Sequence, residues 1–100
     1  MSNGISVSDQ LGPYEWSNEE TAAYEAAIEA INRVVGAYSA VISAEETKDA
    51  PEQDVIDNAR AAQSRLARAR ESLRSSDHEQ IAAARAHYAQ LARDVVAGIA

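Results

Sequence analysis

The sequence predicts an all-α fold, an antiparallel up-down-up three-helix bundle with a long first helix and a flexible N-terminal tail. Three capping boxes support this fold class, because in each a helix-capping side chain is followed three positions later by glutamate. The boxes are Ser17/Glu20, Asp49/Glu52 and Ser76/Glu79. An apolar series follows each box, and only a few residues separate consecutive series, so neighbouring helices are expected to run antiparallel. A long helical hairpin that dimerises is the alternative architecture.

The chain is expected to form one domain behind the tail. Residues 1–16 are rich in Ser, Gly, Asn and Asp and show no sustained period. They include Gly12-Pro13, which predicts a break before the first helix. We therefore assign residues 1–16 to the flexible tail and residues 17–100 to the bundle. The three helices are predicted over about 18–47, 50–74 and 77–97.

Each predicted helix has one apolar face, because its apolar residues alternate at intervals of four and three. The face of the first helix consists of Tyr24, Ile28, Ile31, Val35, Tyr38 and Ile42. The face of the second consists of Val55, Ala59, Ala62, Leu66, Ala69 and Leu73. The face of the third consists of Ile81, Ala84, Tyr88, Leu91 and Val95. The alanines of the second face allow close approach to a neighbour but bury little area.

The predicted core is thin. The chain has no phenylalanine and a single tryptophan, and its apolar share depends largely on alanine. Val96 and Ile99 are expected to add to this core. Burying one larger apolar side chain contributes about 1.5 to 3 kcal/mol, and the entropy lost on ordering the chain is at least as large as the summed gain. Because a domain of this kind often gains stability by associating, we expect a partner or self-association.

The charge of the chain narrows the classes of partner. A net charge of -7 disfavours binding to nucleic acid or to an anionic membrane, and favours a cationic partner. The absence of cysteine excludes disulfides, thiolate metal sites and a cysteine nucleophile. The first residues lack the basic start and apolar stretch of a signal peptide, and no apolar run approaches membrane-spanning length. We therefore expect a cytoplasmic protein.

No motif for catalysis, cofactor binding or metal binding is found. His78 and His87 are nine residues apart and do not share a helix face at metal-ligand spacing. Neither a glycine-rich phosphate loop nor a Ser-His-Asp arrangement can be assembled. The arginines of the second helix do not form one stripe, so a single DNA groove would not contact them all. Convergence of Arg65, Arg70 and Arg85 on one buried cavity would instead indicate a small enzyme for an anionic metabolite.

A second face of the first helix is rich in small residues and is our candidate partner-binding surface. Its members are Ala22, Ala26, Ala30, Arg33, Ala37, Ala40 and Ala44. Exposed helix faces usually carry more charge, whereas small side chains let two helices approach closely. The alternative is that alanine is present simply because it is the best helix former. Tyr14 and Trp16, before the first predicted helix, either pack on the end of the bundle or bind a partner as a short linear motif.

Three hypotheses for function follow from these surfaces. The first is a non-enzymatic protein-protein interaction module, a small acidic bundle that acts as a subunit or adaptor, with self-association as the simplest case. The second is an acidic inhibitor, such as an antitoxin or immunity protein, whose first-helix glutamates cover a basic site on a toxin or nuclease. The third is the small helical enzyme. Association through apolar alanine faces should survive high salt. Inhibition led by charge should instead show an association rate that falls steeply as ionic strength rises.

Overall fold

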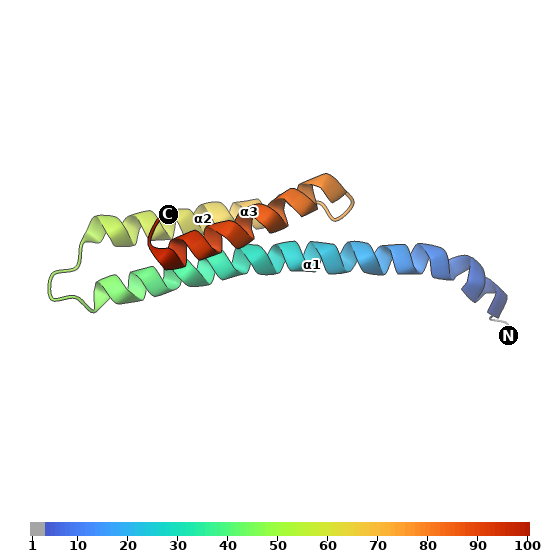
Figure 1. Ribbon diagram of the computed structural model, residues 1–100, viewed down its shortest axis with the longest axis horizontal. Coiled ribbons are helices and arrows are strands. Elements are labelled where there is room, and N and C mark those ends of the chain that lie inside the picture. Colours follow the sequence, from blue (N-terminus) through green and yellow to red (C-terminus); the bar gives the residue numbers. More distant parts are fainter. Residues whose placement is uncertain (1–3) are drawn as a thin grey trace.

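The computed structural model describes the backbone of residues 4–100 and the side chains of residues 18–100. Within this part of the chain the elements are three helices, α1 (Gly4–Glu46), α2 (Gln53–Glu71) and α3 (His78–Ala97). α2 returns along α1, and α3 then runs in the same direction as α1, so the chain goes up, down and up (Figure 1). The predicted all-α three-helix bundle is confirmed.

The first helix begins earlier than the sequence predicted. α1 starts at Gly4 and not near residue 18, so Gly12-Pro13 lies within its bounds and Ser17 does not open it. At its N-terminal end α1 extends past the connection between α2 and α3 (Figure 1). The flexibility predicted for residues 1–16 and the contacts of their side chains lie outside what the structure describes.

The second helix is capped by a residue that the sequence did not indicate. Glu52 occupies the N-cap position, and its side chain makes no capping bond. Instead, the backbone N–H of Glu52 donates to Oε2 of Glu45, the penultimate residue of α1, at 3.0 Å. Lys48 Nζ donates to Oε1 of the same carboxylate at 2.9 Å. Glu45 therefore closes the turn between the two helices and satisfies a free amide at the start of α2.

The third helix starts one residue later than its predicted box. Asp77, not Ser76, is the N-cap, and its carboxylate accepts from the backbone N–H of Gln80 at 3.0 Å. The side chain of Gln80 accepts from the backbone N–H of Arg74 and donates to the carbonyl oxygen of Ser72. Gln80 occupies the position of the capping-box glutamate, but its side chain bonds the backbone of the turn between α2 and α3.

The core follows the length of α1. One cluster of buried side chains joins all three helices and consists of Ile31, Val34, Leu66 and Val95. A second cluster, closer to the turn between α2 and α3, consists of Ala27, Ile81 and Ala84. Ile31 and Val34 are fully buried. On α2 and α3 the buried residues of these clusters belong to the predicted apolar faces. On α1 the buried side shifts to Ala27, Ile31 and Val34, and the other members of the predicted face are half-buried.

Two large apolar residues near the C-terminus, Val96 and Ile99, do not join the core. Val96 and Ile99 are 79% and 74% exposed, so the expectation that they are buried is wrong. Val95 takes the inward position on α3 and is 3% exposed. Val96 is rotated from Val95 by about 100° on the helix and points outward. Ile99 lies after Gly98, whose left-handed φ of 79° ends α3.

α1 is the one helix that both of the others contact. Throughout the described residues, the backbones of α2 and α3 each approach α1 but do not approach one another. Two hollows of about 260 and 290 Å³ lie between α2 and α3, and half-buried Leu73, Tyr88 and Leu91 help to line them. The bundle is therefore open along its α2–α3 side, and α1 holds the other two helices together.

Candidate interaction surface

Three hollows lie in a row between α1 and α3 and together form what we call the α1–α3 groove. Their volumes are about 210, 430 and 500 Å³. Ala82 and Arg85 line both the first and the second hollow, and Arg33 and Ala89 line both the second and the third. The groove is therefore continuous along the two parallel helices.

Alanine is the commonest residue in the floor and walls of the groove. On α1 these alanines are Ala23, Ala26, Ala30 and Ala37. On α3 they are Ala82, Ala86, Ala89, Ala92 and Ala97. The groove exists because both helices have small residues on their adjoining flanks, while the longer arginine side chains lie along its edges. Such a surface lets a further helix approach closely.

The structure divides the predicted partner-binding face of α1 into two parts. Ala30 is 3% exposed beneath α3 and belongs to the core, which corrects its assignment to an open surface. Ala26, Arg33 and Ala37 line the groove. The remaining members are exposed on the outer side of α1, and they are Ala22, Ala40 and Ala44. α3 has thus covered the middle of the predicted face and has added its own alanines beside it.

The contribution of α3 to this surface was not predicted. Val96 lines the third hollow and projects from it as the most exposed large apolar residue of the described part. A signal was present in the sequence, because Ala82, Ala86 and Ala89 follow one another at intervals of four and three on the flank of the apolar series of α3. Arg93 occupies the next position of this spacing. The apolar series beside this flank predicts only the core-facing side of α3.

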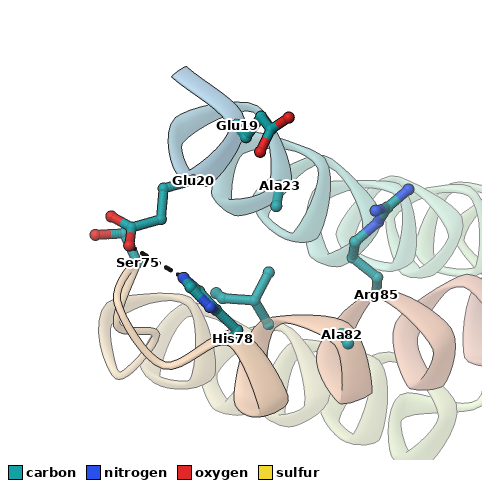
Figure 2. Close-up of a pocket in the computed structure, with 8 residues that line it drawn as sticks. Glu19, Glu20, Ala23, Ser75, His78, Ala82 and Arg85 are labelled. Carbon is teal, nitrogen blue, oxygen red and sulfur yellow. Dashed lines mark hydrogen bonds and ion pairs between the residues drawn. The ribbon is translucent and has the colours of Figure 1, made fainter. Parts of the chain in front are cut away.

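A contact between two side chains closes one end of the groove. His78 Nε2 lies 3.0 Å from Glu20 Oε2, so the first turn of α3 is joined to α1 across 58 positions of sequence. Figure 2 shows this pair at one side of the first hollow and Arg85 at the other, with Ala82 between them on α3. The guanidinium of Arg85 extends toward α1 (Figure 2). His78 is the first residue of α3 and lies at the surface while contacting α1.

The two edges of the groove carry opposite charge. The α3 edge has Arg85 and Arg93, both exposed. On α1, Glu29 lines the second hollow, and Glu25 lies one turn before it on the outer side of the helix; both are exposed. Arg33 on α1 donates to Glu29 at 3.3 Å, and both side chains of this pair are mostly exposed, so the pair contributes little to stability.

The arginines named for a small enzyme lie on different surfaces. Arg65 lines a hollow between α2 and α3, and Arg85 lines the groove between α1 and α3. Arg70 donates to Asn32 Oδ1, on the side where α2 meets α1. They do not converge on one buried cavity, which is the arrangement that binding of an anionic metabolite would require.

The described residues form no metal-ligand cluster, and His87 lies in the α2–α3 hollows beside Tyr88, away from His78. Among the helices, in so far as the structure describes their residues, none has the length and apolar character needed to cross a membrane. Tyr14 and Trp16, the other predicted contact residues, lie outside the described side chains.

Comparison with protein families, with curated proteins and with solved structures finds no match for this chain. The groove and its charges are therefore the basis for a functional proposal.

Proposed function

We propose that this protein is a non-enzymatic protein-protein interaction module that docks a helix in the α1–α3 groove, and that acts as a subunit or adaptor. The single observation that carries the proposal is the continuous alanine-lined groove with Val96 exposed at its end. An amphipathic helix laid in an apolar groove is a recurring mode of protein recognition. Cytoplasmic residence, expected from the sequence, remains part of the proposal.

The energetics of the fold support an interaction role. The largest fully buried side chains are Ile31 and Val34, and much of the remaining core is alanine. Covering the groove would remove further apolar surface from water, at roughly 25 cal/mol per Å². A partner that binds the folded chain and not the unfolded chain stabilises it by mass action. A thin core beside an uncovered groove is the pattern expected of a module that works in an assembly.

The inhibitor hypothesis receives less support because several glutamates of α1 already contact other groups of the chain. Glu20 pairs with His78, Glu29 with Arg33, and Glu46 Oε2 lies 3.5 Å from Arg60 Nη2. Glu45 is buried in the turn before α2. Covering a basic site would require these carboxylates to exchange their partners, so we do not carry this hypothesis further.

The proposal is tested with two alanines of α3 that are three residues apart. Ala86 lines the α1–α3 groove, and Ala83 lines a hollow on the α2–α3 side, and both are exposed. We expect the wild-type chain to increase in mass with concentration in sedimentation velocity, because a second copy is the simplest occupant. Ala86→Glu should remain monomeric, since it places a carboxylate in the groove. Ala83→Glu, which has the same change in charge and helix propensity, should behave as the wild type.

Two outcomes would overturn the proposal for this groove. One is loss of association in Ala83→Glu with association retained in Ala86→Glu, which would assign the interface to the open α2–α3 side. The other is a wild-type chain that stays monomeric up to millimolar concentration. Circular dichroism of both variants checks that each keeps the helical content of the wild type.

A further inference from the structure

We propose that the helix received by the α1–α3 groove is α1 of a second copy of this chain, in a two-fold arrangement. In this arrangement the acidic edge of each α1 faces the basic edge of α3 in the other copy. The inference rests on the proposed function and adds to it the identity of the partner and the charges that orient it.

The first observation is that three charged groups at the groove, Arg85, Arg93 and Glu25, have no oppositely charged partner among the described residues, whereas Glu29 pairs with Arg33. Among the described residues, the side chains of Arg85 and Glu25 have no hydrogen bond or ion pair. Arg93 donates to the neutral Gln90, so the α3 edge as a whole contacts no carboxylate of the described residues. A docking helix therefore needs acidic residues where it passes this edge.

The second observation is that α1 is the helix of this protein with the matching surface. Its outer side is exposed and small, with Ala22, Gly36 and Ala40, and a Cβ added at Gly36 would meet open space. Glu25 and Glu29 lie on the same outer side. Small residues allow α1 to enter a groove floored by alanine, and Glu25 then reaches the arginines of α3. Glu29 reaches them by leaving its pair with Arg33, which is mostly exposed and contributes little to stability.

The other two helices match this requirement poorly. The exposed surface of α2 mixes three arginines with Asp54, Asp57 and Glu71, so it would bring both signs of charge to the α3 edge. α3 has exposed arginine on the edge in question and would repel a copy of itself. The charge pattern therefore selects α1 over α2 and α3.

Symmetry follows from the position of α1. Because α1 itself forms one wall of the groove, entry of α1 from the second copy into this groove brings the first α1 to the groove of the second copy. The same patch is then used on both chains, so the interface is isologous and closes at two subunits. α3 is 20 residues long, which gives about 30 Å of edge for each of the two contacts.

Reversing the charge of one edge at a time tests the inference. One variant combines Glu25→Lys with Glu29→Lys, and a second combines Arg85→Glu with Arg93→Glu. Each single-edge variant places like charges on facing edges, so its dissociation constant should rise by about tenfold or more. A third variant carries all four changes, restores opposite charges, and should associate as the wild type in sedimentation velocity.

The net charges make this comparison specific. The α1 reversal brings the net charge from -7 to about -3 and weakens general repulsion, so a loss of association there comes from the edges themselves. The four-change variant has the wild-type net charge, so its recovery comes from restored pairing. A mass that is unchanged in both single-edge variants would overturn the inference, as would a four-change variant that stays monomeric. If Ala86→Glu still abolishes association in that case, the proposed function stands with another orientation.

Discussion

At the scale of single residues, Glu45 shows how one buried carboxylate can organise a turn. It is 5% exposed, yet both of its oxygens accept hydrogen bonds, one from the backbone N–H of Glu52 and one from Lys48. The bond from Glu52 lowers the pKa of Glu45, and the bond from Lys48 lowers it further. The same contact raises the pKa of Lys48. The charged forms of both groups are therefore stabilised in the folded state.

These shifts predict how stability depends on pH. The pKa of Glu45 is lower in the folded chain than in the unfolded chain. Its contribution to the free energy of unfolding is therefore complete above the unfolded pKa of about 4.3 and is lost as pH falls through the folded pKa. The contribution of Lys48 is complete below its unfolded value of about 10.4 and is lost as pH rises through its raised folded value. Both contributions are present at neutral pH.

Glu45→Gln should lower stability at pH 7 and should weaken the loss of stability on acidification below about pH 5. Urea unfolding at a series of pH values measures both effects. Glu46→Gln is the matched control, because it removes the same charge from an exposed neighbouring position whose carboxylate lies 3.5 Å from Arg60. Equal pH profiles for the two variants would show that the turn does not depend on the Glu45 carboxylate.

The caps also show where residue-level prediction from sequence stops. The three predicted boxes placed helix starts from local pairs, and the start of α3 was correct to within one residue. The spacing of Asp49 and Glu52 predicts Asp49 as the cap of α2. The carboxylate that acts there belongs to Glu45, seven positions before Glu52, and it reaches the amide only after the chain has turned. Contacts made by a folded turn have no fixed spacing in sequence.

At the scale of elements, Gly36 within α1 and Gly98 at the end of α3 have opposite effects on helix stability. Gly36 lies in the interior of α1, where no described heavy atom lies within 4 Å of an added Cβ. Gly98 ends α3 with a φ of 79°, which side chains rarely adopt. Glycine therefore weakens the first helix and is needed at the end of the third.

Gly36→Ala should raise the free energy of unfolding by about 1 kcal/mol, because alanine is favoured over glycine inside a helix by that amount. Gly98→Ala should lower it by about 1 kcal/mol, because the left-handed conformation is strained for alanine. Chemical denaturation of both variants in the monomeric Ala86→Glu background separates these effects from association. A change of the same sign in the free energy of unfolding for both substitutions would contradict the opposite effects of Gly36 and Gly98.

The alanine flanks show why element-level prediction found only part of the site. Periodicity identified the inward face of each helix and the small-residue face of α1. It did not say how far α3 would cover that face, because coverage depends on where two helices of different sequence meet. Ala30 lies in the core and Ala26 lies in the wall of the groove, although both belong to the same predicted partner-binding face. Val96 was assigned to the core because it is apolar, and its rotation from Val95 decided otherwise.

At the scale of the whole molecule, the arrangement is slender, with principal extents of 69, 24 and 21 Å. The fold class could be predicted because three short-range patterns and short connections leave few ways to arrange the helices. The open α2–α3 side could not be predicted, because three similar apolar faces are equally compatible with a closed bundle. In the described part of the chain, every close approach between helix backbones involves α1.

A fragment that contains residues 50–100 tests this dependence on α1. Because α2 and α3 do not approach each other closely, we expect the fragment to lose most of the helical signal that these residues have in the intact chain. Circular dichroism of the fragment, compared with that of the full chain, measures the loss. A fragment that melts cooperatively would show that α2 and α3 have a stable interface of their own.

The attachment of α3 has a consequence for regulation. The groove has one wall on α1 and one on α3, and in the residues that the structure describes α1 is the helix whose backbone α3 approaches closely. Undocking of α3 would therefore abolish the binding surface, whereas a bound helix would hold α3 in place. Occupancy and tertiary order are in this way thermodynamically linked, and any modification that loosens α3 would act as a release mechanism for the partner.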